Sequence, residues 1–360
     1  LANAELPDEA KKSYIETNSE HIKNYIFPAY AELKEGLTAL RETGKNNNGL
    51  CHLPDGRKFY ELTVASETGS SRTIPELQQL TQGQMFKDLT DMQKILSPTA
   101  EGASVSSDLF KTQGTLLENP DPTAILNDLQ DKLTDNFPKP PKVNTEIKYV
   151  QKSMEEYLSP AFYMIPAIDN SADNVIYINQ GHLPDDLSLF TTLAHEGYPG
   201  HLYQTTYYAS RKPDLIRNLL NYGGYVEGWA TYSEMMSYYY APVSKEQATL
   251  MQKNTSVILG LYALADMGIH YEGWTLLDAV SFFRSYGITD TDTIEKIYDL
   301  IIADPANYLK YYIGYVEFLE MKKEALEAWG DDFSQKKFHK AVLDIGPAPF
   351  DLVREYALKK

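Results

Sequence analysis

The chain has 360 residues, of which 43% are hydrophobic and 23% charged, the balance of an ordinary globular protein. Its apolar runs fall far short of the roughly 20 residues that a membrane-spanning helix needs, so no transmembrane segment is expected. The formal net charge of −17, without a basic cluster, argues against nucleic acid as a partner. The single cysteine, Cys51, excludes an internal disulfide and a cysteine-based zinc site. The first residues show no signal-peptide pattern.

The first part of the chain is expected to be a helix followed by a hairpin. Apolar residues recur at three- and four-residue spacing over 8–43, which predicts a helix that Pro28 should kink. Residues 52–66 are β-prone on both sides of a Pro-Asp-Gly turn at 54–56, which predicts a short β-hairpin.

Helices are expected over most of the following stretch. Thr73 can cap a helix, and the Ile-Pro-Glu that follows it suits a first turn, which predicts a helix to about residue 97. Two more helices are predicted over 104–117 and 121–136.

A proline-rich stretch divides the chain. The sequence PKPPK at 138–142 is typical of a stiff, extended connector, and it predicts a boundary between an N-terminal helical region, 1–140, and a second region, 141–360. Two short β-prone segments, 145–151 and 173–179, follow the connector. From residue 184 onward the pattern is helical. We therefore expect a mainly α fold with a small β-sheet beside its central helices.

Two of the seven histidines lie in one string, TTLAHEGYPGH, at residues 191–201. His195 is followed at once by Glu196, as in helical zinc sites where the glutamate acts as general base on a metal-bound water. His201 comes six positions after His195 and would point about 120° away from it on a straight helix. A shared metal site therefore requires a break at 197–200, which Pro199 and Gly200 favour. The alternative is that His195 packs or caps and Glu196 faces solvent.

A second acidic string, VEGWATYSE at 226–234, falls in an expected helix. Glu227 and Glu234 are seven residues apart and share one face of that helix. Two histidines and Glu227 would form a three-ligand site for one Zn²⁺ with an open position for water, although cobalt or manganese would also fit. Glu234 could orient a ligand histidine by a hydrogen bond. The alternative for Glu227 is a surface acid on an amphipathic helix.

These strings, with YLKYYIGYVEFLEMK at 308–322, resemble the bacterial domain-of-unknown-function-885 (DUF885) family over at least 173–350. That family is similar to zinc peptidases of the gluzincin type, whose third ligand is a glutamate on a later helix. The resemblance implies a metallopeptidase-like region over 141–360, with His195, His201 and Glu227 as zinc ligands. Glu196 would be the general base.

The resemblance and the chemistry together suggest further site residues. Tyr311 falls in the family's late Ser-Tyr-Lys-x-Gly pattern, where this chain keeps the tyrosine but neither the serine nor the lysine. We expect Tyr311, and Tyr312 as second choice, to donate to the developing oxyanion, because a phenol donates without being charged. The alternative for either tyrosine is packing in the core or on the surface. Asn179 ends a strand that, by resemblance, would hold an extended substrate by main-chain bonds. Gln204 would contact the substrate or the groups around the ligands.

The sequence therefore predicts a zinc-dependent hydrolase, with a peptide as the favoured substrate. A metal-dependent amidohydrolase of a small amide, and a non-catalytic helical binding protein that keeps the fold, stay open as alternatives. Many members of the family are exported or lipid-anchored. The resemblance thus favours an extracytoplasmic location, with membrane attachment only through a lipid anchor outside this chain.

Overall fold

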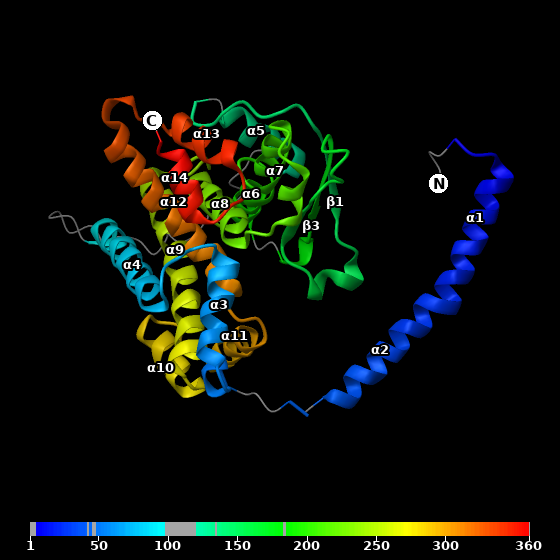
Figure 1. Ribbon diagram of the computed structural model, residues 1–360, viewed down its shortest axis with the longest axis horizontal. Helices are drawn as coiled ribbons and strands as arrows, with labels where there is room; N and C mark the ends of the chain where they lie inside the picture. The colour runs from blue at the N-terminus through cyan, green and yellow to red at the C-terminus, as the bar shows by residue number, and fades with distance from the viewer. Residues whose placement is uncertain are drawn as a thin grey trace. The chain divides into compact units, whose positions relative to one another are not determined.

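The computed structural model describes residues 5–41, 43–44, 48–97, 120–133, 135–182 and 185–359. These residues form mainly helices with one small mixed sheet of three strands, which confirms the expected fold class (Figure 1). Backbone contacts divide the chain into two compact units, 1–47 and 48–360. Among the described helices, none combines the length and the apolar character needed to cross a bilayer.

The first unit is a long helical segment, as the spacing of its apolar residues predicts. Helix α1 (Asp8–His21) leads through one π-helical turn (Ile22–Ile26) into α2 (Phe27–Leu40). Pro28 lies in the first turn of α2 and cannot donate a main-chain hydrogen bond to the preceding turn, which accounts for the irregular turn before it.

The second unit begins with a helix where a hairpin was expected, and the hairpin prediction over 52–66 is wrong. A short 3-10 turn (Leu50–His52) precedes helix α3 (Gly56–Thr68). The Pro-Asp-Gly turn lies at the start of this helix instead of joining two strands. The buried positions recur every four residues, which is a helical and not a strand period: Gly56, Tyr60, Val64 and Thr68.

Helix α4 (Ile74–Leu96) lies where the sequence places it, and α5 (Pro122–Lys132) begins as expected but ends at Lys132 instead of residue 136. The side chain of Glu76 accepts hydrogen bonds from the main-chain N–H and the hydroxyl of Thr73, both at 2.8 Å. This arrangement belongs to a capping box, which satisfies main-chain donors that the first helical turn leaves free. The helix expected over 104–117 lies outside the described residues.

The proline-rich connector at 138–142 has no regular secondary structure. Helices α3 and α4, which precede it, pack on α9 (Lys245–Met267) and α12 (Asn307–Trp329), which follow it. The parts of the second unit before and after the connector therefore share one hydrophobic core. The division of the chain into domains at residue 141 stays a prediction.

The sheet contains the two expected strands and a third one between them in the sequence. Strands β1 (Asn144–Tyr149) and β3 (Asp173–Ile178) pair in parallel, and β2 (Ala161–Met164) pairs antiparallel with β3. The spatial order is β1-β3-β2, so β3 is central and β2 is an edge strand. Strand β2 has only four residues, too few for its period to stand out in the sequence.

The remaining chain is almost entirely helical, as expected from residue 184 onward. In addition to α9 and α12 it contains α6 (Asp186–Glu196), α7 (His201–Ser210), α8 (Gly223–Ser237), α10 (Leu276–Ser285), α11 (Thr291–Ala303), α13 (Gln335–Ile345) and α14 (Phe350–Ala357). Helices α8 and α12 lie side by side, with α6 against α8 (Figure 1). These three helices, with α7 and β2, carry the site described next.

Candidate metal centre

His195 and His201 lie on either side of a break between two helices. Helix α6 ends at Glu196 and α7 begins at His201, so the chain breaks over 197–200, as a shared site for the two histidines requires. The break is closed by hydrogen bonds from the Gly200 N–H to the Ala194 carbonyl (2.9 Å) and from the Tyr203 N–H to the Gly197 carbonyl (3.1 Å).

Gly200 has a steric role in this break. A Cβ atom at this position would lie 1.7 Å from the carbonyl oxygen of His195, well inside van der Waals contact. The chain therefore needs glycine here because its backbone approaches the end of α6 so closely. The close approach brings the first residue of α7 back beside the last turn of α6.

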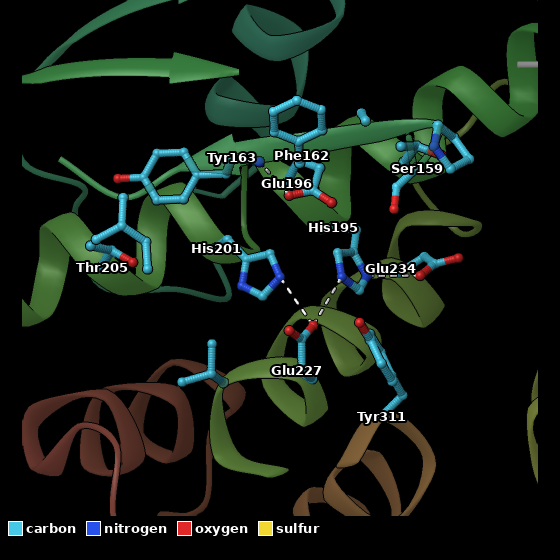
Figure 2. Close-up of a pocket in the computed structure, with 15 residues that line it drawn as sticks. Ser159, Phe162, Tyr163, His195, Glu196, His201, Thr205, Glu227, Glu234 and Tyr311 are labelled. Carbon is cyan, nitrogen blue, oxygen red and sulfur yellow. Dashed lines mark hydrogen bonds and ion pairs between the residues drawn. The ribbon is translucent and has the colours of Figure 1, made fainter. Parts of the chain in front are cut away.

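The two imidazoles converge with a carboxylate from α8. The ring centroids of His195 and His201 lie 4.9 Å apart. Glu227 Oε2 lies 3.7 Å from His195 Nε2 and 3.3 Å from His201 Nε2 (Figure 2). One possible ligand atom from each residue lies within 4.8 Å of the others. Tetrahedral zinc with bonds of about 2.0–2.1 Å places its ligand atoms about 3.3 Å apart, so this group could hold a metal ion.

The electrostatics of His195 and Glu227 suit a neighbouring positive charge. Burial pushes the pKa of His195 down, but its hydrogen bonds with Glu227 and Glu234 outweigh burial and raise that pKa well above its usual value. Burial pushes the pKa of Glu227 up, but its contacts with His195 and His201 outweigh burial and hold that pKa far below its usual value. Both directions have one cause: the Glu227 carboxylate attracts positive charge on the imidazoles beside it, and it would attract a metal cation in the same way.

Glu234 contacts the other nitrogen of the same histidine. His195 Nδ1 lies 3.0 Å from Glu234 Oε2, and both glutamates are on α8, two helical turns apart. A proton held on Nδ1 by this carboxylate leaves the lone pair of Nε2 free to bind a metal. Glu234 therefore lies beside His195, and its role in orienting that histidine stays a prediction.

Glu196 faces the same pocket as the three possible ligands. Its Oε2 accepts a hydrogen bond of 2.8 Å from the main-chain N–H of Tyr163 on β2. Figure 2 shows its carboxylate between strand β2 and the ring of His195. The pocket has a volume of about 430 Å³, and Glu196, Tyr163, Glu227 and Tyr311 are among its lining residues. The carboxylate is thus held by the edge strand on one side of the pocket.

Tyr311 enters the pocket from α12. Its ring lies 6.4 Å from the ring of His195, at an interplanar angle of 28°, and its hydroxyl points toward the space beside Glu227 (Figure 2). Burial, reinforced by the charges of Glu227 and Glu196, raises the pKa of the Tyr311 phenol well above its usual value. The hydroxyl therefore stays protonated at neutral pH and can donate a hydrogen bond into the pocket.

Three predicted substrate-binding residues do not line this pocket. Asn179 is buried, and its amide donates to the carbonyls of Glu155 and Leu158 at 2.8 Å each, so it fixes the segment before β2. Tyr312 is fully buried and lies under Gly260 of α9, while Gln204 is 2% exposed inside the core. Helical geometry explains Tyr312: successive residues point about 100° apart, so only one of two adjacent tyrosines can face the pocket.

The strand that was predicted to bind substrate has no free edge at which a substrate could pair. Strand β3, which contains Tyr177 and Ile178, is paired on both sides and offers no free edge. The strand that faces the pocket is β2, through Phe162 and Tyr163. The sequence of β2, AFYM, is apolar, but it did not predict a strand or its position beside the two histidines.

Two glycines that the sequence reasoning did not single out bring α8 and α12 together. A Cβ on Gly228 would lie 2.4 Å from the Cα of Gly314, and a Cβ on Gly314 would lie 2.0 Å from the carbonyl oxygen of Gly224. Gly228 directly follows Glu227 and Gly314 lies one turn after Tyr311. The close crossing therefore sets the position of Glu227 against Tyr311. The sequence signal for this close crossing was the glycine in each motif, Gly228 in EGW and Gly314 in YIG.

The fold and the site define a mainly α protein with a two-histidine, one-glutamate group that could hold a metal ion. The chain belongs to the family of bacterial proteins of unknown function DUF885, whose pattern matches residues 1–356. No match was found among curated proteins.

Two solved structures share the fold. A candidate lipoprotein from Colwellia psychrerythraea is 20% identical, with a TM-score of 0.81, over 98% of this chain and 63% of its own. A candidate lipoprotein of unknown function from Shewanella oneidensis is 21% identical, with a TM-score of 0.65, over 99% of this chain and 68% of its own. The chain thus spans about two thirds of the length of these relatives.

Proposed function

We propose that this protein is a zinc-dependent hydrolase that cleaves peptide bonds. The observation that carries the proposal is the convergence of His195, His201 and Glu227 on one side of a pocket that also contains the carboxylate of Glu196. Two imidazoles and one carboxylate form a donor set that suits zinc and leaves a coordination position open. When bound, zinc would supply a Lewis acid that polarises a carbonyl and makes water acidic near neutral pH.

The protein's own groups have separate roles in this chemistry. Glu196, held by the Tyr163 N–H, accepts a proton from the attacking water and passes it to the leaving amine. Glu234 holds His195 in the tautomer that presents Nε2. The Tyr311 hydroxyl donates to the oxyanion that develops on the substrate carbonyl.

An extended substrate would bind along strand β2. Because Tyr163 donates its N–H to Glu196, this residue turns its main-chain polar groups away from β3 and toward the pocket. In an antiparallel pair the N–H and the C=O of one residue point to the same side, so the Tyr163 carbonyl also faces the pocket. A peptide added at this edge would place its main chain beside the metal centre, with Phe162 and Ile165 as apolar contacts.

We also propose that the protein works outside the cytoplasm as part of a lipid-anchored or secreted protein. The support is that both structural neighbours are described as candidate lipoproteins. Fractionation of the native host, with detection of this chain in the membrane or the extracytoplasmic fraction, tests this proposal. Recovery of the chain only in the cytoplasm contradicts it.

The activity is tested by a peptide-library digest read by mass spectrometry, with the zinc-loaded chain compared to Glu196→Gln. We expect cleavage by the native chain and at least a 100-fold loss in the variant, which keeps its metal ligands. A panel of small amides is assayed in parallel. Turnover of small amides without cleavage of any peptide contradicts the peptidase assignment, and equal turnover in Glu196→Gln contradicts the mechanism.

A further inference from the structure

A buried carboxylate lies at the point where helix α12 begins. Asp266, near the end of α9, has no exposed surface. Its Oδ1 accepts a hydrogen bond of 2.5 Å from the Tyr60 hydroxyl, which comes from α3. Both of its oxygens lie 3.1 Å from the N–H of Ala306, the residue directly before α12. One side chain therefore ties α3 and α9 to the first residues of α12.

The residue that Asp266 contacts has an unusual backbone conformation. Ala306 has φ 67° and ψ 5°, in the left-handed region that residues with a Cβ seldom adopt. Such a conformation persists only where the surroundings hold it. Ala306 is fully buried, and the carboxylate of Asp266 accepts its N–H, so the structure shows what holds this turn.

The turn matters because of what α12 carries. Tyr311 lies in the second turn of this helix and reaches the pocket beside His195. A helix is stiff over such a short distance, so the direction in which it starts decides where its early side chains point. A change in the turn at Ala306 would move the Tyr311 hydroxyl relative to Glu227, which is anchored on α8.

We propose that Asp266 is a positioning residue, which places the Tyr311 hydroxyl at the metal centre by holding Ala306 in the turn that starts α12. Asp266 does not touch the pocket and acts only through Tyr311. The proposal rests on the proposed function for its kinetic readout. A purely structural Asp266 would instead change stability and leave the step that depends on Tyr311 untouched.

The test uses the zinc-loaded chain and the best peptide from the library digest. Asp266→Leu keeps the number and branching of the side-chain heavy atoms, in a larger side chain, and removes the acceptor. We expect kcat to fall at least about tenfold while KM and zinc content stay unchanged. Asp266→Asn still offers an oxygen to Ala306 and should keep kcat within about twofold. Adding Ala306→Gly to Asp266→Leu should restore most of kcat, because glycine adopts left-handed angles without help.

The decisive comparison is the double-mutant cycle with Tyr311→Phe. If Asp266 acts through Tyr311, Asp266→Leu should lower kcat no further in the Tyr311→Phe background. An equal loss in both backgrounds, or an unchanged kcat in Asp266→Leu alone, overturns the proposal. If Asp266→Leu does not fold, Tyr60→Phe replaces it in the cycle. We expect Tyr60→Phe to lower kcat about threefold, and to lower kcat no further in the Tyr311→Phe background.

A second readout separates this proposal from the proposed function. Amide hydrogen exchange over 304–311 should be faster in Asp266→Leu than in the native chain, and normal in Asp266→Asn. If the native chain shows no turnover, the hydrolase assignment is contradicted but the positioning role of Asp266 is not. Unchanged exchange in Asp266→Leu contradicts the positioning role whatever the activity.

Discussion

Gly228 on α8 and Gly314 on α12 meet where these helices cross, so closely that a Cβ on Gly228 would lie 2.4 Å from the Cα of Gly314. The two helices deliver Glu227 and Tyr311 to neighbouring positions beside the ring of His195 (Figure 2). The close crossing at these two glycines is one constraint on the distance between Glu227 and Tyr311, and the turn at Ala306 is a second one.

Gly314→Ala should destabilise the protein by about 1–3 kcal/mol, because its new methyl group meets the main chain of α8, which cannot move aside cheaply. The measurement is urea unfolding followed by circular dichroism. Gly83→Ala is the matched control: it lies within α4 with open space around its Cα and should be neutral or stabilising by up to about 1 kcal/mol. Equal stability of Gly314→Ala and the native chain would contradict the close crossing.

Glu234→Gln should weaken zinc binding roughly 10- to 100-fold, because the neutral amide holds the Nδ1 proton of His195 less strongly. Competition with a chromophoric chelator measures the affinity. Glu246→Gln, a change in the first turn of α9, is the control and should leave the affinity unchanged. Undiminished affinity in Glu234→Gln would rule out the orienting role.

His339 should make the protein less stable as the pH falls. Burial lowers the pKa of this imidazole to about 3, and its Nδ1 lies 2.6 Å from the Asn136 carbonyl. The folded state therefore keeps the ring neutral while the unfolded chain takes up a proton below about pH 6.5. The free energy of unfolding should decline from about pH 6.5 toward pH 3, by up to roughly 5 kcal/mol from this group.

Urea unfolding at a series of pH values measures this decline. His339→Gln, whose amide can still donate to the Asn136 carbonyl, should show a flatter profile over this range even if it is less stable throughout. The same slope in both proteins would mean that His339 is not the group responsible.

Asp266 should make the protein less stable as the pH rises, the opposite of the effect of His339. Burial raises the pKa of this carboxyl to about 7, against the lowering effect of its bonds with Tyr60 and Ala306. The folded state then binds a proton between about pH 4 and pH 7 that the unfolded chain has released. Stability from this group is present at low pH and is lost as the pH rises to 7, by up to roughly 4 kcal/mol. Asp266→Asn should remove this loss in the same unfolding series, and a profile still falling equally steeply would refute it.

Local signals in the sequence predicted local structure well. The Thr73 cap, strands β1 and β3 and the helical segment, expected over 8–43 and found over 8–40, depend on neighbouring residues, and the structure contains them. The break at 197–200 was a requirement of the metal hypothesis that proline and glycine made feasible. The hairpin prediction over 52–66 failed because a Pro-Asp-Gly turn serves equally well before a helix.

What the sequence could not provide was pairing between distant parts of the chain. Nothing near Tyr163 indicated that its N–H would hold Glu196, and nothing near Asp266 indicated that it would meet Ala306. The roles predicted for Asn179, Gln204 and Tyr312 depended on which way each side chain points. Packing against other elements decides that direction.

Elemental analysis of protein purified without chelator is the most direct test of a metal centre at this site. Each protein is supplied with zinc and then dialysed to remove unbound metal. The native chain and Glu196→Gln should each hold about one zinc ion per chain after dialysis, and Glu227→Gln should hold none. Native protein that binds no metal when zinc is supplied, or Glu227→Gln that keeps a full equivalent, would contradict the account.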